Sequence, residues 1–285
     1  MTYLNHITNP NEPFLSKADE EAATTTYTQG RFRVSTRKLP ISKAGAIEAM
    51  TMEIGIPLPE MIFGDNLVQL LHVPTGWNIS FNTPDALKGV DTTGEHVLKV
   101  AYARDWESTR EGTTRKIKDA VQPYDWSYST NYRGTVTGRG EARVGFRPTT
   151  QQIPIELLKR RDPMLFFDEV VLYESELDDN GISVYSAKLR VHEKRMLLLC
   201  RLFMRLDNVI VRLRDTRVYV DFETDEVIRE YTAKESSFES VKGALLAKGL
   251  LPDEVTVAMR EPNQLDPILS LVEQTTEAVN LSLCE

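Results

Sequence analysis

Apolar and polar residues alternate along several successive runs between residues 166 and 231, a pattern that predicts a series of antiparallel strands. The clearest run covers residues 196–206, in which every even position is apolar. Positions of the opposite parity include Arg195, Arg201 and Arg205. Because side chains alternate between the two faces of a strand, one face of this run is expected to lie in the core. We therefore place this strand at the centre of a sheet.

Short connections set the expected register upstream of the central strand. If the dipeptide at 193–194 is a two-residue connection, Val191 lies opposite Met196. A further strand is expected over residues 166–176, before a loop rich in Asp, Asn and Gly. The residues of that strand expected on the core face are Phe167, Val171 and Tyr173.

The dipeptide at 207–208, Asp-Asn, follows the central strand, and both residue types tolerate the left-handed backbone conformation. We expect a two-residue hairpin loop here, which sets Leu206 opposite Val209. Continuing the ladder brings Arg201 opposite Arg214 on the face away from the core. Two arginines in this position destabilise a sheet unless an anion lies between them.

The rest of the chain predicts more strands and a few helices at the margins. Strands are expected over residues 30–38, 67–73, 77–81, 97–102, 124–128 and 142–147. Helices are expected over residues 42–55, 83–87, 153–158, 236–248 and 267–281. The predicted fold class is mainly β (α+β), with an antiparallel meander that forms a β-sandwich-like core and a few short peripheral helices. Residues 1–28 are polar and are expected to be a disordered tail, and residues 29–285 a single domain with a C-terminal helical segment.

Charge and composition narrow the class of protein. The chain of 285 residues carries a net charge of −8, which argues against nucleic acid as a partner. Residues 182–219 hold nine Lys or Arg against three Asp or Glu, a net charge of +6, so the remainder carries −14. No run approaches the roughly 18 apolar residues of a membrane span, and no membrane partner is expected. Two cysteines far apart in sequence and the lack of an export signal favour a reducing compartment.

A search for catalytic chemistry finds no nucleotide-binding loop, no zinc-protease motif, no nucleophile elbow and no paired cysteines. The four histidines do not cluster, so neither a metal nor a cofactor is expected. Carboxylates are many, and a carboxylate-dependent hydrolase within a β-rich fold is therefore kept as the alternative function.

Four ordered blocks of the sequence resemble the Tip-forty-one family, the TIPRL-type regulators of TOR signalling. The blocks are residues 58–66 (LPEMIFGDN), 124–129 (YDWSYS) with Tyr132 and Gly134, 166–183, and 212–219 (RLRDTRVY) with 229–232 (REYT). The resemblance spans residues 30–235. Asn208 stands where relatives tend to have glycine, which keeps the turn.

The resemblance implies a non-catalytic protein of the cytoplasm, with the nucleus as a second location. It implies binding to the catalytic subunits of type 2A-like protein phosphatases, whose activity or assembly the protein tunes downstream of TOR. The yeast branch further implies a Tap-forty-two-type phosphatase-associated protein as a partner. A phosphatase inhibition assay beside a broad hydrolase screen would separate this function from the hydrolase alternative.

Six residues are candidates for partner binding. Asp85 and Asp215 are carried over by the resemblance, and both also fit structural roles at the edges of elements. The register adds four arginines. They are Arg201, Arg212, Arg214 and Arg217. The phosphatases that the resemblance supplies end in a flexible tail with acidic and aromatic residues and a free carboxylate, which arginine forks can bind bidentately. Equally, acidic side chains of this same chain could cover the arginines.

Overall fold

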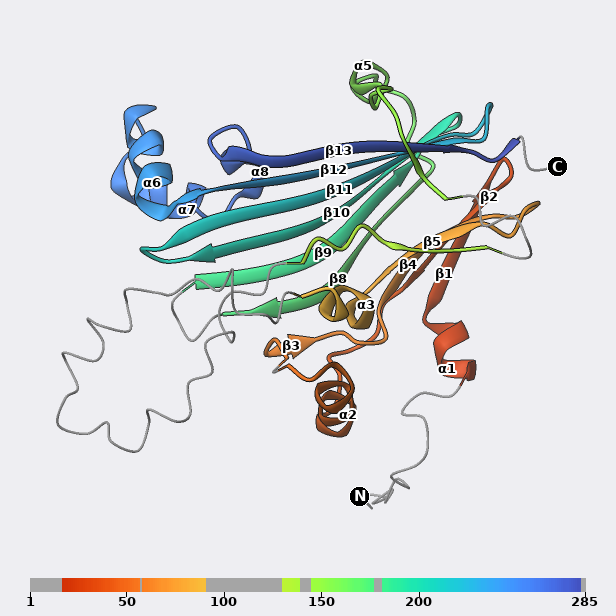
Figure 1. Ribbon diagram of the computed structural model, residues 1–285, viewed down its shortest axis with the longest axis horizontal. Coiled ribbons are helices and arrows are strands. Elements are labelled where there is room, and N and C mark those ends of the chain that lie inside the picture. The colour runs from red at the N-terminus through yellow and green to blue at the C-terminus, as the bar shows by residue number, and fades with distance from the viewer. Residues whose placement is uncertain (1–16, 57, 91–129, 139–144, 177–180, 283–285) are drawn as a thin grey trace.

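The computed structural model describes residues 17–56, 58–90, 130–138, 145–176 and 181–282, and within them two antiparallel sheets pack face to face (Figure 1). The smaller sheet has the order β1-β2-β4-β5-β6. Its strands are β1 (Thr24–Gln29), β2 (Phe32–Arg37), β4 (Leu67–His72), β5 (Asn78–Asn82) and β6 (Thr135–Thr137). The mainly β fold class, with two sheets and short helices, is confirmed.

The larger sheet has the order β3-β8-β9-β10-β11-β12-β13-β7. Its long strands are β8 (Phe166–Ser175), β9 (Gly181–Val191), β10 (Arg195–Leu206), β11 (Ile210–Asp221), β12 (Glu226–Ser237) and β13 (Ser270–Asn280). Two-residue strands, β3 (Met61–Ile62) and β7 (Arg147–Pro148), border it. Because β8 to β12 follow one another in the chain, the expected meander is present, with β10 inside the sheet.

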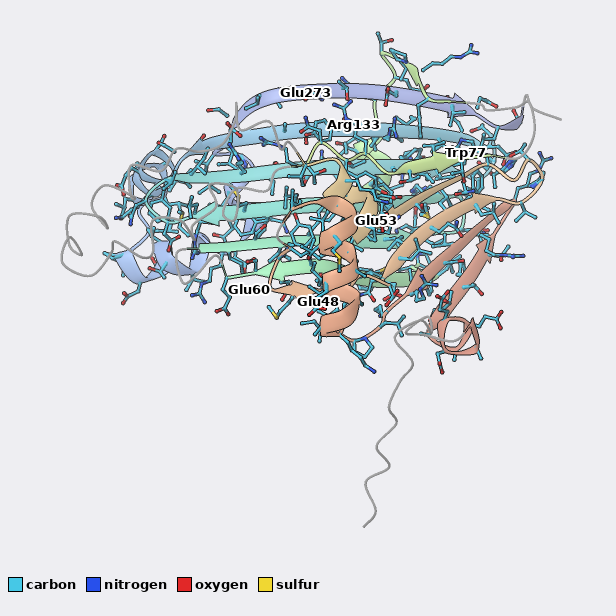
Figure 2. The ribbon with its side chains drawn as sticks, turned by 60° about the horizontal axis from the view of Figure 1, so that its bottom comes forward. Glu48, Glu53, Glu60, Trp77, Arg133 and Glu273 are labelled. Carbon is cyan, nitrogen blue, oxygen red and sulfur yellow. The ribbon has the colours of Figure 1, made fainter. Side chains whose placement is uncertain are left out.

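Short helices surround the sheets. They are α1 (Lys17–Ala22), α2 (Ala44–Ile54), α3 (Thr83–Lys88), α5 (Ile155–Leu158), α6 (Phe238–Ala247), α7 (Pro252–Ala258) and α8 (Pro262–Leu265). The helix expected before Gly55 is α2, and Gly55 ends it with a φ of 77°. Figure 2 shows α2 outside the sheets, with Glu48 and Glu53 on it. Its N-cap is Lys43, and the hydroxyl of the preceding Ser42 accepts a hydrogen bond from the Gly64 amide at 2.9 Å.

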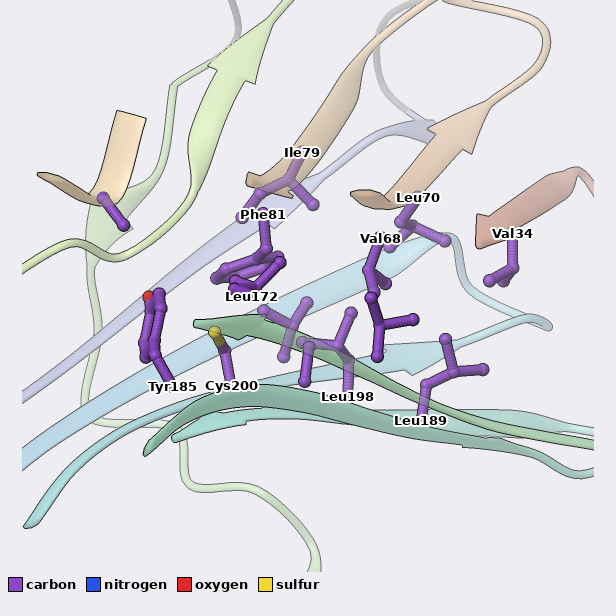
Figure 3. Close-up of a cluster of buried hydrophobic side chains, with 14 of the residues drawn as sticks. Val34, Val68, Leu70, Ile79, Phe81, Leu172, Tyr185, Leu189, Leu198 and Cys200 are labelled. Carbon is purple, nitrogen blue, oxygen red and sulfur yellow. The ribbon is translucent and has the colours of Figure 1, made fainter. Parts of the chain in front are cut away.

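The main core lies between the two sheets (Figure 3). From the smaller sheet it takes Val34, Leu70 and Phe81, and from the larger sheet Leu189 and Leu198. All five are at most 2% exposed. We call the side of the larger sheet that faces this core the inner face, and the opposite side the outer face.

The register expected upstream of the central strand is confirmed. Val191 pairs with Met196, and the His192 amide donates to the Arg195 carbonyl across the two-residue turn at 193–194. In β8 the core face is as expected for Tyr173, which is fully buried, but not for Phe167 and Val171, because the pairing shifts between Val171 and Tyr173. Phe167 pairs with Arg190 on the outer face and is 53% exposed.

The register expected for the hairpin at 207–208 is wrong by one residue. Leu206 pairs with Ile210, so the loop holds three residues, and Asn208 adopts the left-handed conformation with a φ of 61°. Three-residue loops with one left-handed residue are a common hairpin type, and the sequence alone does not separate it from the two-residue type. Consequently Arg201 lies opposite Asp215, not opposite Arg214.

Two expectations for the chain ends need correction. Part of the segment expected to be a disordered tail forms α1 and the edge strand β1, whose threonines suit a strand. Within residues 267–281 the structure has β13 rather than a helix, because this segment pairs with β12 along its length. The strands expected over 97–102 and 124–128 lie outside the described residues, and so do residues 142–144 of the strand expected over 142–147.

Candidate partner-binding residues

Asp85 lies in the first turn of α3, where it joins that helix to β6. The Asn82 side chain caps the helix by accepting from the Asp85 amide at 2.9 Å, and its Nδ2 donates to Asp85 Oδ2 at 2.8 Å. Thr135 Oγ1 in β6 also donates to Asp85 Oδ2. Tyr132 shares a hydrogen bond with that threonine hydroxyl at 2.8 Å, so Asp85 belongs to a small polar network. Tyr132 also accepts, through its carbonyl, from Thr216 on the inner face, which places the network on that side.

The corrected register distributes the other candidates over both faces of the larger sheet. Residues paired across antiparallel strands point to the same side. Arg214 pairs with Leu202, a core residue, and Arg212 with Met204, so both arginines point to the inner face. Asp215 pairs with Arg201, and both point to the outer face together with Arg217. One face therefore does not carry all four arginines.

We call Arg201, Arg217, Asp215 and Glu230 the outer cluster. Each of its two arginines is paired with carboxylates of this same chain. Arg201 binds both oxygens of Asp215, from Nε and Nη2, at 2.7 Å each, and its Nη1 donates to Asn263 in α8 at 2.7 Å. Arg217 donates to Asp215 at 3.1 Å and to Glu230 at 2.9 Å. Burial lowers the pKa of Arg201, but the hydrogen bonds and charge of Asp215 outweigh it, and the pKa ends above its ordinary value. Two cations face two anions here, and the charges balance.

We call Arg212, Arg214 and Glu235 the inner cluster. Within the described residues its two positive charges meet one negative charge. Arg212 donates from Nε to Glu235 Oε2 at 3.0 Å, and Arg214 donates from Nη2 to the same oxygen at 2.6 Å. Both arginines are at most 9% exposed, yet they share one carboxylate. Burial lowers the pKa of Arg212, the charge of Glu235 offsets this only in part, and Arg214 lowers it further. In the described part of the chain, Arg214 Nε is buried without a hydrogen-bond partner, and the hydrogen bonds of Arg212 come from Nε alone.

Further charged and aromatic side chains border the inner cluster. The Arg133 guanidinium lies 4.2 Å from the ring centroid of Tyr231, and it pairs with Glu273 in β13 at 2.5 Å (Figure 2). The Tyr231 hydroxyl donates to Asn131 at 2.8 Å. Glu235 is absent from the sequence-based candidates, although it lies directly opposite Arg212 in the pairing of β11 with β12. The signal that points to it is the register of β12, which the turn between these two strands sets.

The structure thus gives every candidate arginine an internal carboxylate, as one of the two sequence-based explanations expected. It does not show a partner, so the partner-binding role of the six residues stays a prediction. Among the described residues, no group of three or more His, Cys, Asp or Glu is placed to hold a metal ion. No helix among them is long and apolar enough to cross a membrane.

Comparison with known proteins identifies similar chains. The model of the TIP41-like family matches residues 61–242. The chain is 37% identical to the TIP41-like protein of Homo sapiens over 250 residues, which cover 87% of this chain and 86% of the human protein. It is 41% identical to the TIP41-like protein of Dictyostelium discoideum over 221 residues, 75% of this chain and 80% of that protein. It is 35% identical to the type 2A phosphatase activator TIP41 of Saccharomyces cerevisiae over 264 residues, 86% of this chain and 72% of that protein.

Proposed function

Because the chain belongs to the TIP41-like family, we propose that it is a non-catalytic regulator that binds the catalytic subunit of type 2A-like protein phosphatases. In this proposal it modulates their activity or assembly downstream of TOR signalling, in the cytoplasm, with a Tap-forty-two-type protein as a second partner. The name of the yeast relative, type 2A phosphatase activator, supports the link to these phosphatases.

The observation that carries the proposed binding site is the charge imbalance of the inner cluster. Arg212 and Arg214 share a single carboxylate, and guanidinium N–H groups remain without acceptors in the described part of the chain. A second carboxylate would complete this arrangement, since arginine forks bind carboxylates through paired hydrogen bonds. The phosphatase C-terminal tail, with its acidic residues and terminal carboxylate, has this chemistry.

The remaining candidates take different roles in the proposal. Asp85 belongs to the polar network on the inner side, through Thr135 and Tyr132, and it would contact the partner at the rim of the site. Arg201, Asp215 and Arg217 hold β10, β11 and β12 together on the outer face, and they would support the partner site by fixing the strands that carry it.

The test is calorimetric binding of a phosphatase C-terminal peptide to two matched variants on the same strand. Arg212→Gln removes a charge from the inner face, and Arg217→Gln removes one from the outer face. We expect Arg212→Gln to weaken binding by about tenfold or more, because in the proposal this buried arginine contacts the tail directly. Arg217→Gln should change binding by less than about threefold, because Arg217 lies on the opposite face of the sheet. Circular dichroism verifies that both variants fold.

Two results would contradict the site. One is unchanged affinity in Arg212→Gln, and the other is an equal loss in both variants. Asp85→Asn extends the test to the rim, where the proposal expects weaker binding with an unchanged fold. Binding of the intact catalytic subunit by the wild-type chain tests the proposed function itself.

A further inference from the structure

A run of exposed residues joins α5 to β8. Residues 159–165 are all exposed, and they contain Lys159, Arg160 and Arg161 followed by Met164 and Leu165. Met164 is 53% exposed and Leu165 43%. Phe167, two residues into β8, is 53% exposed as well. We call residues 159–167 together with Arg190 the α5–β8 corner.

The corner is held in a defined position on the sheet. The Leu165 amide donates to the Val191 carbonyl at 2.8 Å, and a hydrogen bond of 3.0 Å joins His192 Nδ1 to the Pro163 carbonyl. Phe167 pairs with Arg190 across β8 and β9, so its ring and that guanidinium share the outer face. The apolar side chains are therefore held exposed by backbone pairing.

The corner carries positive charge in a negative protein. It holds four cations, Lys159, Arg160, Arg161 and Arg190, and one anion, Asp162, a net charge of +3. Since the whole chain carries −8, the rest of it carries −11. Arg160, Arg161 and Arg190 are exposed, and none of them makes an ion pair within the described residues. By contrast, the candidate arginines of β10 and β11 all have carboxylate partners.

We propose that the α5–β8 corner docks the protein reversibly on an anionic lipid surface. Exposed apolar side chains beside unpaired arginines are the features by which proteins lie at a membrane interface without crossing it. The neighbouring α5 projects from the sheets, with Ile155 47% exposed on it (Figure 1). A projecting apolar element enters a soft lipid interface readily, whereas a rigid protein partner would need a matching hollow. The sequence-based expectation of no membrane partner rested on the lack of a spanning segment, which such docking does not need.

The experiment is co-sedimentation of the purified full chain with two kinds of vesicles, phosphatidylcholine alone and phosphatidylcholine with about 30% phosphatidylserine. We expect sedimentation only with the anionic vesicles, and we expect salt to weaken it. Arg160→Glu/Arg161→Glu should lower the bound fraction at limiting lipid by about tenfold or more, since each basic residue near an anionic surface contributes. Phe167→Ser should lower it to a smaller extent without changing its salt dependence.

Matched variants elsewhere control for overall charge and apolarity. Lys242→Glu/Lys248→Glu on and after α6 makes the same change in net charge, and Leu251→Ser removes an apolar side chain that is 66% exposed. Both should sediment like the wild type. Equal sedimentation with the two kinds of vesicles, or equal loss in the corner variant and its control, overturns the proposal. So does corner-dependent binding of an acidic peptide, measured by fluorescence anisotropy, in a chain that does not sediment with anionic vesicles, because the partner would then be a protein.

Discussion

Arginines of similar burial in neighbouring strands differ here in how their charge is compensated. Arg201 shares Asp215 with Arg217, but Arg217 has Glu230 as a second carboxylate. Arg212 and Arg214 have only Glu235 between them in the described part of the chain. The sequence shows that arginines gather in this region but not which carboxylate each one meets. That depends on a single residue of register, because a one-residue slip moves a side chain to the other face. The number of carboxylates available to each arginine within the chain thus distinguishes a structural arginine from a candidate binding arginine.

We expect Asp215 to act mainly by stabilising the fold. Its side chain is 1% exposed and neutralises Arg201 and Arg217. Asp215→Asn leaves a buried guanidinium without its anion, so we expect the free energy of unfolding to fall by about 3–5 kcal/mol. Urea denaturation measures this. The control is Asp207→Asn, which breaks a pair with Arg205 at a carboxylate 38% exposed and should cost less than about 1 kcal/mol. Equal losses would show that the burial of Asp215 contributes nothing.

Asp168 links the two sheets and should make stability depend on pH. It accepts from Thr36 of β2 at 2.5 Å and from Lys38 at 2.5 Å. Burial raises the pKa of Asp168, but these hydrogen bonds and one from the Glu169 amide outweigh it, so the pKa lies below its ordinary value. A carboxylate with a depressed pKa stabilises the folded state above its unfolded pKa, about 3.9, and this stabilisation is lost as pH falls through the folded value.

The melting temperatures of the wild type and of Asp168→Asn should differ by an amount that depends on pH. The difference in melting temperature should be largest and constant between about pH 5 and 7, and it should shrink below about pH 4. Differential scanning calorimetry at each pH measures it. A difference that grows on acidification would show that Asp168 is protonated more readily in the folded protein, contrary to the hydrogen bonds seen.

Elements with strong local signals could be predicted from the sequence. Elements whose structure depends on pairing with a distant strand could not. The β9–β10 register follows from two residues of turn and a strict alternation, and α2 ends where Gly55 allows it to end. The spacing of apolar residues in β13 also suits a helix, and only its pairing with β12 makes this segment a strand. β1 is polar because it lies at a sheet edge, and a polar edge strand resembles a tail in sequence.

The β10–β11 turn depends on a left-handed residue, and substitutions there should change stability. Asn208 has a φ of 61°, a region that suits glycine and asparagine but strains most residues. Asn208→Ala should therefore lower the free energy of unfolding by about 1 kcal/mol, whereas Asn208→Gly should change it by less than about 0.5 kcal/mol. Chemical denaturation of the two variants measures both. Equal effects would mean that the backbone conformation at this position does not set the cost.

The whole molecule is joined by strands that are buried on both faces. On their inner face, β10 and β11 pack Leu198 and Val218 into the core between the sheets. On their outer face they carry a second cluster, in which Phe203 and Leu213 pack against Leu245 of α6. Because the same two strands form part of both clusters, we expect the helices α6 to α8 and the smaller sheet to unfold together.

The test perturbs one cluster and observes the other. Trp77 is 1% exposed in the core between the sheets, and Trp106→Phe/Trp126→Phe would leave it as the sole tryptophan. In that background Leu245→Ala should lower the free energy of unfolding by about 2–5 kcal/mol, as truncation of a buried leucine does. The urea transitions of Trp77 fluorescence and of far-ultraviolet circular dichroism should shift together. The adjacent Leu246→Ala, at a side chain 44% exposed, should shift neither by more than about 0.5 kcal/mol. A Trp77 transition that stays in place while the dichroism shifts would show instead that the outer helices unfold on their own, and that β10 and β11 do not couple the two clusters.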